Sequence, residues 1–365
     1  MSTKPEPVNV WRIDVGEEEI ARIAEAMRNG RISQGAITDD FERELSARLD
    51  VPHAVCVPNG TSALMMAYLC LGIGPGDEVI LPARTWVATA NAALLLGATV
   101  RLVDLEEKRP VLDPAKLERA ISERTRAIVP VHLNGIAADM EAILAIAEQR
   151  DIPVVEDACQ ALFSRHKGQY LGGFGRFGAF SLGLAKLLTT GQGGVLVCQN
   201  DRDAEIARQM RNQGQVGGVM GEKIARLGGN FKFTDMQAAM GLAQLDRIPA
   251  RLERQRAIQR AYLAGLGDFP GLTPLAANLD AGEIPLRAEW LADDRNALIA
   301  KLAEKNIQCA AQGVGLHRLP HIANDPNAYP IADHIDGRLV TLPSGPEQPL
   351  INVERAISAI TGRYV

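Results

Sequence analysis

Two residues in the middle of the chain have the types and settings for covalent cofactor chemistry. Asp157 follows the apolar run 152–155, and Lys186 stands between Ser181 and a glycine-rich turn. A lysine among apolar neighbours loses solvation, so its pKa falls and its amine can attack a carbonyl carbon. A carboxylate at a strand end can hold a pyridinium nitrogen protonated. The pair therefore predicts a site for pyridoxal 5′-phosphate (PLP), which carries an aldehyde on a pyridine ring.

Two upstream segments add groups to this site. Gly60 and Thr61 follow the apolar run 54–57 and open a helix-like segment, where the unpaired N–H groups of a helix N-terminus suit a phosphate. Trp86 follows the strand-like residues 78–81, where its ring could stack on a flat cofactor. Each segment also has an ordinary interpretation, which is a helix N-cap for residues 59–61 and core packing for Trp86.

Alternating strand-like and helix-like segments indicate the scaffold that positions these residues. Helical spacing of apolar residues, as at 117–121 and 140–149, separates short apolar runs. The runs occupy residues 54–57, 78–81, 99–103, 127–131, 152–155 and 194–198. Such alternation predicts an α/β fold whose mostly parallel sheet is covered by helices on both faces. Ligands bind at the carboxyl ends of such strands, which is where Asp157 and Trp86 fall.

The length and pattern of the chain predict two domains. A large PLP-binding domain would span residues 1–248, and a linker helix with a smaller C-terminal α+β domain would span 249–365. N-terminal residues would pack on the small domain. Within it, 284–291 and 307–311 are predicted strands, and 293–306 is a predicted helix.

Several longer segments in order resemble the DegT/DnrJ/EryC1/StrS family of PLP-dependent sugar aminotransferases, which have fold type I. The resemblance covers about residues 14–262, and many landmarks in order are specific where any single one is weak. The landmarks are DVGEEEIARIAEAMRNGRISQG (14–35), VPNGTSAL (57–64), ARTWVATANAALLLGATVRLVD (83–104), PVHLNGIAADM (130–140), VEDACQA (155–161), FSLGLAKLLTTGQGG (180–194) and GGNFKFTDMQAAMGLAQLDRI (228–248). The resemblance implies a mostly parallel, seven-stranded-type sheet.

The resemblance also implies a role for each matching residue. Lys186 would bind the cofactor covalently and then move protons, and Asp157 would bind the pyridine nitrogen. Asn230 would reach the phosphate in the neighbouring subunit, so the protein would be a homodimer with shared active sites. The remaining positions would contact the ring hydroxyl (Gln160), the ring face (Trp86) and the phosphate (Gly60, Thr61 and Ser181).

Composition limits the other partners. The formal net charge of −5 leaves no basic footprint for nucleic acid, and no apolar run reaches the roughly 18 residues that span a membrane. The polar N-terminus lacks a signal-type apolar core. The 5 cysteines lie singly, as buried reduced thiols do, and the 6 histidines lack metal-ligand spacing. These features predict a cytoplasmic enzyme without a metal, a membrane or a nucleic-acid partner.

The predicted reaction moves an amino group from an amino acid, L-glutamate, to a nucleotide-linked keto-sugar for amino-sugar biosynthesis. A cyclitol or other ketone of a secondary-metabolite pathway is the alternative acceptor. A non-catalytic regulator is disfavoured because Lys186, Asp157 and Ser181 are all present. Relatives that dehydrate a deoxysugar carry His in place of the lysine, so Lys186 argues against that activity. Residues 310–317 depart from the family, where an aromatic residue often precedes Pro-Leu-His in a segment that shapes the acceptor site.

Overall fold

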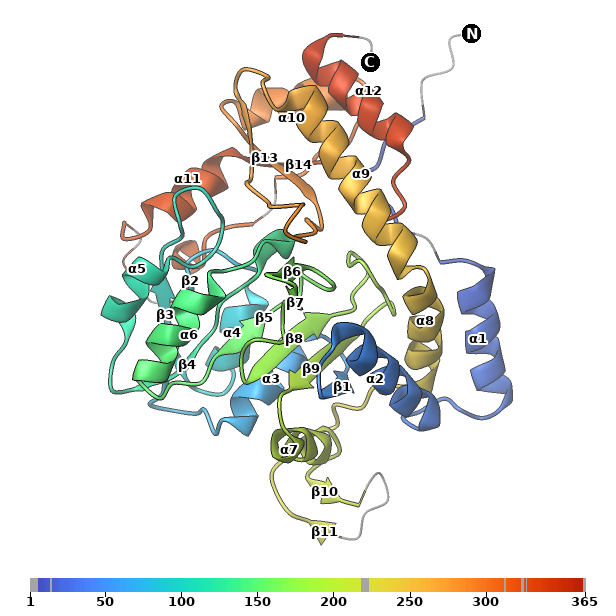
Figure 1. Ribbon diagram of the computed structural model, residues 1–365, viewed down its shortest axis with the longest axis vertical. Helices are drawn as coiled ribbons and strands as arrows, with labels where there is room; N and C mark the ends of the chain where they lie inside the picture. The colour runs from blue at the N-terminus through green and yellow to red at the C-terminus, as the bar shows by residue number, and fades with distance from the viewer. Residues whose placement is uncertain are drawn as a thin grey trace.

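Seven strands form the central sheet of the computed structural model, which describes residues 6–13, 15–217, 223–311, 313–322, 325 and 327–363 (Figure 1). A four-stranded sheet has the order β1-β9-β8-β5, and a three-stranded sheet has the order β3-β2-β4. Parallel bridges Ile128–Val154 and Val131–Asp157 join β4 to β5. Among the described strands of this sheet, β9 runs opposite to the other six. The strands are β1 (His53–Val57), β2 (Glu78–Pro82), β3 (Thr99–Val103), β4 (Thr125–Ile128), β5 (Val155–Asp157), β8 (Phe177–Ser181) and β9 (Gly194–Cys198).

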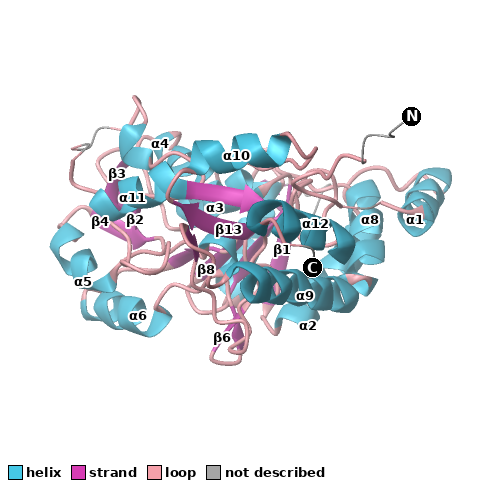
Figure 2. Cartoon of the chain, turned by 90° about the horizontal axis from the view of Figure 1, so that it is seen from above, coloured by secondary structure: helices cyan, strands magenta, loops and turns pink. Residues whose placement is uncertain are grey.

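Helices cover both faces of this sheet, as the alternating sequence pattern predicts. Figure 2 shows α4 and α6 on opposite sides of β2, β3 and β4. Strands β2 and β9 are buried along their whole length, which is the burial expected of strands covered on two faces. The helices of the first 250 residues are α1 (Glu17–Arg28), α2 (Ala36–Leu49), α3 (Gly60–Cys70), α4 (Ala88–Leu94), α5 (Pro114–Leu117), α6 (Met140–Gln149), α7 (Asp201–Arg211) and α8 (Asp235–Asp246).

A smaller antiparallel sheet lies in the C-terminal part, with the order β12-β13-β14. It has its own core, in which Trp290 and Tyr262 are among the largest buried side chains. The N-terminal Val8 belongs to the same core and bridges to Ile307. The elements here are α9 (Ile248–Leu266), β12 (Leu272–Pro274), β13 (Ala288–Ala292), α10 (Arg295–Ala303), α11 (Pro330–Arg338), β14 (Leu339–Leu342) and α12 (Leu350–Thr361). We propose the domain boundary at 248/249 on the basis of this separate core.

Short elements complete the described chain. Two-residue hairpins pair β6 (Arg165–His166) with β7 (Gln169–Tyr170), and β10 (Gln215–Val216) with β11 (Lys223–Ile224). Single 3-10 turns occupy Glu118–Ala120, Leu133–Gly135 and Leu316–Arg318.

Several predicted strands differ from the observed ones for identifiable reasons. Strands β4 and β5 are displaced from the apolar runs because Pro130 and Pro153 have no N–H to donate to a ladder. Residues 307–311 are not a strand, because Ile307 bridges to Val8 whereas Ala310 bridges to Thr341, so neither contact extends into a ladder. The amides of Ile284 and Arg287 donate instead to the Ser164 and Asn134 side chains, and the Leu286 amide donates to the Asn134 carbonyl.

Candidate active site

A cleft of about 690 Å³ opens at the carboxyl ends of the sheet strands. It collects every predicted site residue except Asn230. Asp157 ends β5, Ser181 ends β8 and Gly60 begins α3, so three separate elements deliver their groups to one place. The cleft residues from the prediction are Gly60, Thr61, Trp86, Asp157, Gln160, Ser181 and Lys186.

Asp157 is buried and held by two donors that fix its carboxylate. The Thr89 hydroxyl is 2.6 Å from Oδ2, and the Cys159 amide donates to Oδ1 over 3.1 Å. Thr89 has only one hydroxyl proton, and its oxygen also lies 3.1 Å from the Thr85 hydroxyl and 3.0 Å from the Trp86 carbonyl. The consistent arrangement has Thr85 donating to Thr89 and Thr89 donating to Asp157. This chain of hydroxyls fixes the orientation of the carboxylate that would pair with a pyridinium.

Sequence reasoning missed Thr89, although it lies within the family landmark 83–104. Its place in the first turn of α4, which follows the carboxyl end of β2, was the available signal, because ligands bind at the carboxyl ends of such strands.

Replacing Thr89 with valine should lower turnover roughly 10-fold, because a hydrogen bond to a charged group is lost while the side-chain shape stays. Cofactor content and melting temperature should change little. Thr85→Val, which acts one bond further from the carboxylate, should have a smaller effect. Steady-state kinetics of both variants check this order, and equal turnover in Thr89→Val and wild type would remove Thr89 from the site.

The N-terminus of α3 lies at the cleft and could hold an anion. Asn59 caps the helix by accepting from the Ser62 amide over 2.9 Å, and helix geometry leaves the Gly60 and Thr61 amides without intrahelical acceptors. A Cβ at Gly60 would lie 2.7 Å from the Cys159 Sγ and 3.0 Å from the Ser181 Cβ. Glycine is therefore required for these elements to meet. The N-cap interpretation holds for Asn59, and the free amides beside it fit a phosphate.

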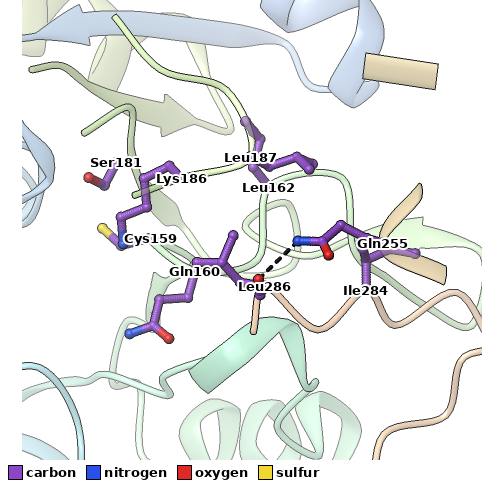
Figure 3. Close-up of a pocket in the computed structure, with 9 residues that line it drawn as sticks. All are labelled: Cys159, Gln160, Leu162, Ser181, Lys186, Leu187, Gln255, Ile284 and Leu286. Atoms are coloured by element: carbon purple, nitrogen blue, oxygen red, sulfur yellow. Dashed lines mark hydrogen bonds between the residues drawn. The ribbon is translucent and has the colours of Figure 1, made fainter. Parts of the chain in front are cut away.

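Lys186 lies on a loop that is closed at its base. Leu182 donates to the Gly193 carbonyl over 2.8 Å and accepts from the Thr190 amide over 3.0 Å. Burial lowers the pKa of Lys186, and the positive charge of Arg287 acts in the same direction. Figure 3 shows Lys186, Ser181 and Cys159 together on one side of a small pocket that adjoins the cleft. The lysine therefore has the reduced proton affinity that nucleophilic attack on an aldehyde requires.

Trp86 is not a core residue, so that interpretation is wrong. The side chain is 67% exposed although it is large and apolar, and it lines the cleft. An exposed indole that lines the cleft is suited to cover a flat ring.

Gln160 is positioned by a residue that the sequence did not reveal. Its Oε1 accepts from the Asn134 amide over 3.0 Å. Asn134 has the left-handed backbone conformation (φ 55°), and its own side chain binds both the amide and the carbonyl of Arg287. The HLNG sequence at 132–135 contained the signal, because Asn-Gly marks a sharp turn.

Asn230 lies outside the cleft of its own chain. Its side chain is exposed, and its Oδ1 accepts from Lys232 over 3.2 Å. One antiparallel bridge joins it to Asn212. The structure therefore does not bring Asn230 to the other predicted site residues within one subunit.

The remaining sequence predictions concern the cysteines, metal ligands and membrane spans. Burial raises the pKa of the Cys159 thiol well above its usual range, so the group is a neutral thiol. Within the described ranges, no group of three or more His, Cys, Asp or Glu residues is arranged to hold a metal. None of the described helices combines the length and apolar character needed to cross a membrane.

Comparison with known proteins agrees with this geometry. The profile of the DegT/DnrJ/EryC1/StrS aminotransferase family matches residues 13–361. This chain belongs to that family. The GDP-perosamine synthase of Caulobacter vibrioides is 33% identical over 364 residues, which cover 96% of this chain and 95% of the synthase. The predicted family is thus confirmed, and the match extends past residue 262, where the resemblance in the sequence ended.

Two solved structures share the fold of this family member. DesV of S. venezuelae, in complex with a ketimine intermediate, has a TM-score of 0.90 at 33% identity and covers 94% of each chain. A putative sugar aminotransferase of Streptococcus pneumoniae in its PLP form has a TM-score of 0.90 at 28% identity, covering 98% of this chain and 97% of that chain. The predicted fold type, the aminotransferase activity and the PLP cofactor are thereby confirmed.

Proposed function

We propose that this enzyme transfers the amino group of L-glutamate to a nucleotide-linked keto-sugar, as a step in amino-sugar biosynthesis. The observation that carries the proposal is the meeting of Lys186, the Thr89–Asp157 pair and the α3 N-terminus in one cleft of about 690 Å³. That volume lies in the ordinary range for small-molecule sites.

Each residue has a proposed task in this reaction. Bound PLP would supply an electron sink for the carbon that gains or loses the amino group. Lys186 would attach the cofactor and carry a proton, and Asp157 would stabilise the protonated pyridine nitrogen. Gly60, Thr61 and Ser181 would hold the phosphate. Trp86 would cover the ring, and Gln160 would contact the ring hydroxyl.

The cleft wall that contains Ala311 and Gly313 has room for a bulky polar ketone. Ala311 and Gly313 line the cleft, and Gly313 has a positive φ of 92°. Small side chains at this wall leave room beside the cofactor. The names of the relatives, a GDP-perosamine synthase and a putative sugar aminotransferase, also support a sugar acceptor.

A panel of keto-sugar nucleotides and cyclitol ketones, each with L-glutamate, tests the proposal by 2-oxoglutarate formation. We expect a keto-sugar nucleotide to support the fastest release, and no release without a ketone beyond one turnover per subunit. Faster turnover with a cyclitol ketone would favour the alternative acceptor, and Lys186→Ala is the blank for both.

We further propose a homodimer in which Asn230 of each subunit contacts the phosphate in the other. The exposure of Asn230 outside its own cleft supports this arrangement, as does the resemblance. A two-fold axis would let each subunit give and receive the same residue.

Mixing two inactive variants should restore activity if the sites are shared. A dimer of one Lys186→Ala chain and one Asn230→Asp chain has one site with both defects and one with neither. Random pairing of equal amounts then gives roughly a quarter of wild-type activity, since half of the dimers carry one intact site. Activity is measured after proven subunit exchange, with each variant alone as the control. Absence of recovery, or a fully active monomer, would contradict the shared site.

A further inference from the structure

Arg287 lies in one wall of the cleft. Hydrogen bonds fix its backbone, whereas its guanidinium forms no ion pair with a described residue. The Arg287 amide donates to the Asn134 Oδ1 over 2.7 Å, and its carbonyl accepts from Asn134 Nδ2 and Gln259 Nε2. Over the described part of the chain, its side chain makes no hydrogen bond or ion pair. The Trp11 ring centroid lies 5.9 Å from its Cζ. Arg287 therefore presents a positive charge to the cleft from a rigid base.

Glu289 lines the same cleft two residues further along, on β13. It is only 9% exposed, and its buried Oε2 has no partner within the described residues. Thr341 lies directly opposite on β14, and its buried hydroxyl also lacks a partner there. Burial raises the pKa of Glu289, whereas Arg84 and Arg287 act to lower it. Glu289 can therefore exist either as a neutral acid or as a carboxylate that pairs with Arg287.

The second arginine of the wall is already neutralised. Arg84 donates from Nε to the Asp336 Oδ1 over 2.7 Å, and both side chains are largely buried. Arg287 is therefore the arginine of this wall that can take a new anion.

We propose that Arg287 binds the α-carboxylate of the amino donor, and that Glu289 replaces this carboxylate as the partner of Arg287 when the acceptor occupies the site. The inference rests on the proposed function, in which one cleft takes an amino acid and a sugar in turn. An amino acid carries a carboxylate on its reacting carbon, whereas a keto-sugar carries hydroxyls there. When the keto-sugar is bound, no substrate carboxylate pairs with Arg287. A desolvated, unpaired guanidinium costs free energy, so Glu289 must be available as its partner.

The donor carboxylate fits Arg287 better than the diphosphate of a sugar nucleotide does. The α-carboxylate is bonded to the carbon that exchanges its amino group, so its binding residue must lie close to Lys186. The charge of Arg287 acts on Lys186, which agrees with that closeness. A diphosphate is separated from the reacting carbon by the sugar ring. The planar fork of arginine also suits bidentate contact with a carboxylate.

The two half-reactions, followed separately by cofactor absorbance, test the proposal in the holoenzyme. In the first, L-glutamate gives its amino group to the cofactor and leaves as 2-oxoglutarate. In the second, the keto-sugar nucleotide that wild type uses fastest in the panel takes that amino group. We expect Arg287→Gln to lower kcat/KM about 100-fold with L-glutamate and less than about threefold in the second half-reaction. Arg287→Lys should fall between, because it keeps the charge and loses the fork.

Glu289→Gln should show the opposite pattern. The amide cannot neutralise Arg287, so the second half-reaction should slow about 10-fold. The donor half-reaction should be unchanged or faster, because the competing carboxylate is gone. Arg254→Gln, on the exposed face of α9, controls for a general change of charge and should alter neither.

A pair of amines identifies the carboxylate that Arg287 binds. 4-Aminobutyrate keeps the distal carboxylate of glutamate but lacks the α-carboxylate, so Arg287→Gln should not slow it. 2-Methylglutamate has no α-hydrogen and binds without turnover, so calorimetry should show about 100-fold weaker binding to Arg287→Gln. An unchanged response of Arg287→Gln and Arg287→Lys to L-glutamate overturns the inference while the proposed function stands. Equal slowing of both half-reactions in Glu289→Gln overturns the exchange of partners. A wild-type enzyme that accepts no amino acid overturns the proposed function itself.

Discussion

Replacing Lys186 with alanine should reduce transamination by at least about 10⁴-fold and leave the fold intact. The variant loses both a nucleophile and a proton carrier, and these contributions multiply. Borohydride treatment of wild-type holoenzyme should fix the cofactor on the peptide that contains Lys186. Lys167→Ala is the matched control, because that lysine is exposed and pairs with Glu141 on the surface. A label on another lysine would refute the assignment.

The apo form of the Lys186 variant should be at least as stable as wild type near neutral pH. The folded-state pKa of Lys186 is lowered, so folding disfavours its charged form and the apo protein carries a penalty below the ordinary lysine pKa. That penalty shrinks as the pH rises through the lowered pKa, and alanine removes it. The melting temperatures of the two apo proteins should therefore converge at high pH. A variant that melts well below wild type across the whole range would contradict this account.

Asp157→Asn should lower turnover by about 10²–10³-fold while the bound PLP content falls far less. The contact with the pyridinium matters most when negative charge builds up on the cofactor, so its loss appears in the transition state. The structure can accommodate the amide. Its oxygen would face the Cys159 N–H, and its NH₂ would face Thr89, whose hydroxyl can turn to the Trp86 carbonyl 3.0 Å away. Kinetics and cofactor release on denaturation measure the two quantities.

Asp139→Asn is the control for that substitution. Asp139 caps α6 by accepting from the Ala142 amide over 3.2 Å, and asparagine caps a helix as well as aspartate does. This variant should keep both activity and cofactor. Near-normal turnover in Asp157→Asn would remove the carboxylate from the proposed chemistry.

The sequence predicted the residues that local pattern places at strand and helix ends. Asp157 ends a buried strand and Gly60 begins a helix, and an apolar run followed by a polar residue or a glycine marks such positions without tertiary information. Ser181 ends β8, which is not among the predicted apolar runs, so its role was implied by the family resemblance alone. The helix over 140–149 was predicted to the residue from the helical spacing of its apolar residues, and the structure adds Asp139 as its N-cap.

The residues that the sequence did not predict act through contacts across long separations. Thr89 meets Asp157, and Asn134 meets Arg287, only because the sheet brings distant turns together. Residues 284–287 alternate like a strand, yet their amides bind Asn134 and Ser164 instead of a neighbouring strand. Periodicity reports which face of a segment is buried, and it does not report the partner that satisfies its backbone.

Asn134 also limits how substrates can enter. The Leu286 amide donates to its backbone carbonyl over 3.2 Å, and its side chain holds both backbone groups of Arg287. A hinge motion that swung the C-terminal wall away from the sheet would have to break all of these bonds at a buried residue. Catalysis should therefore proceed in a preformed vestibule, with access governed by side chains at its mouth, and viscosity or domain-closure effects on kcat should be small.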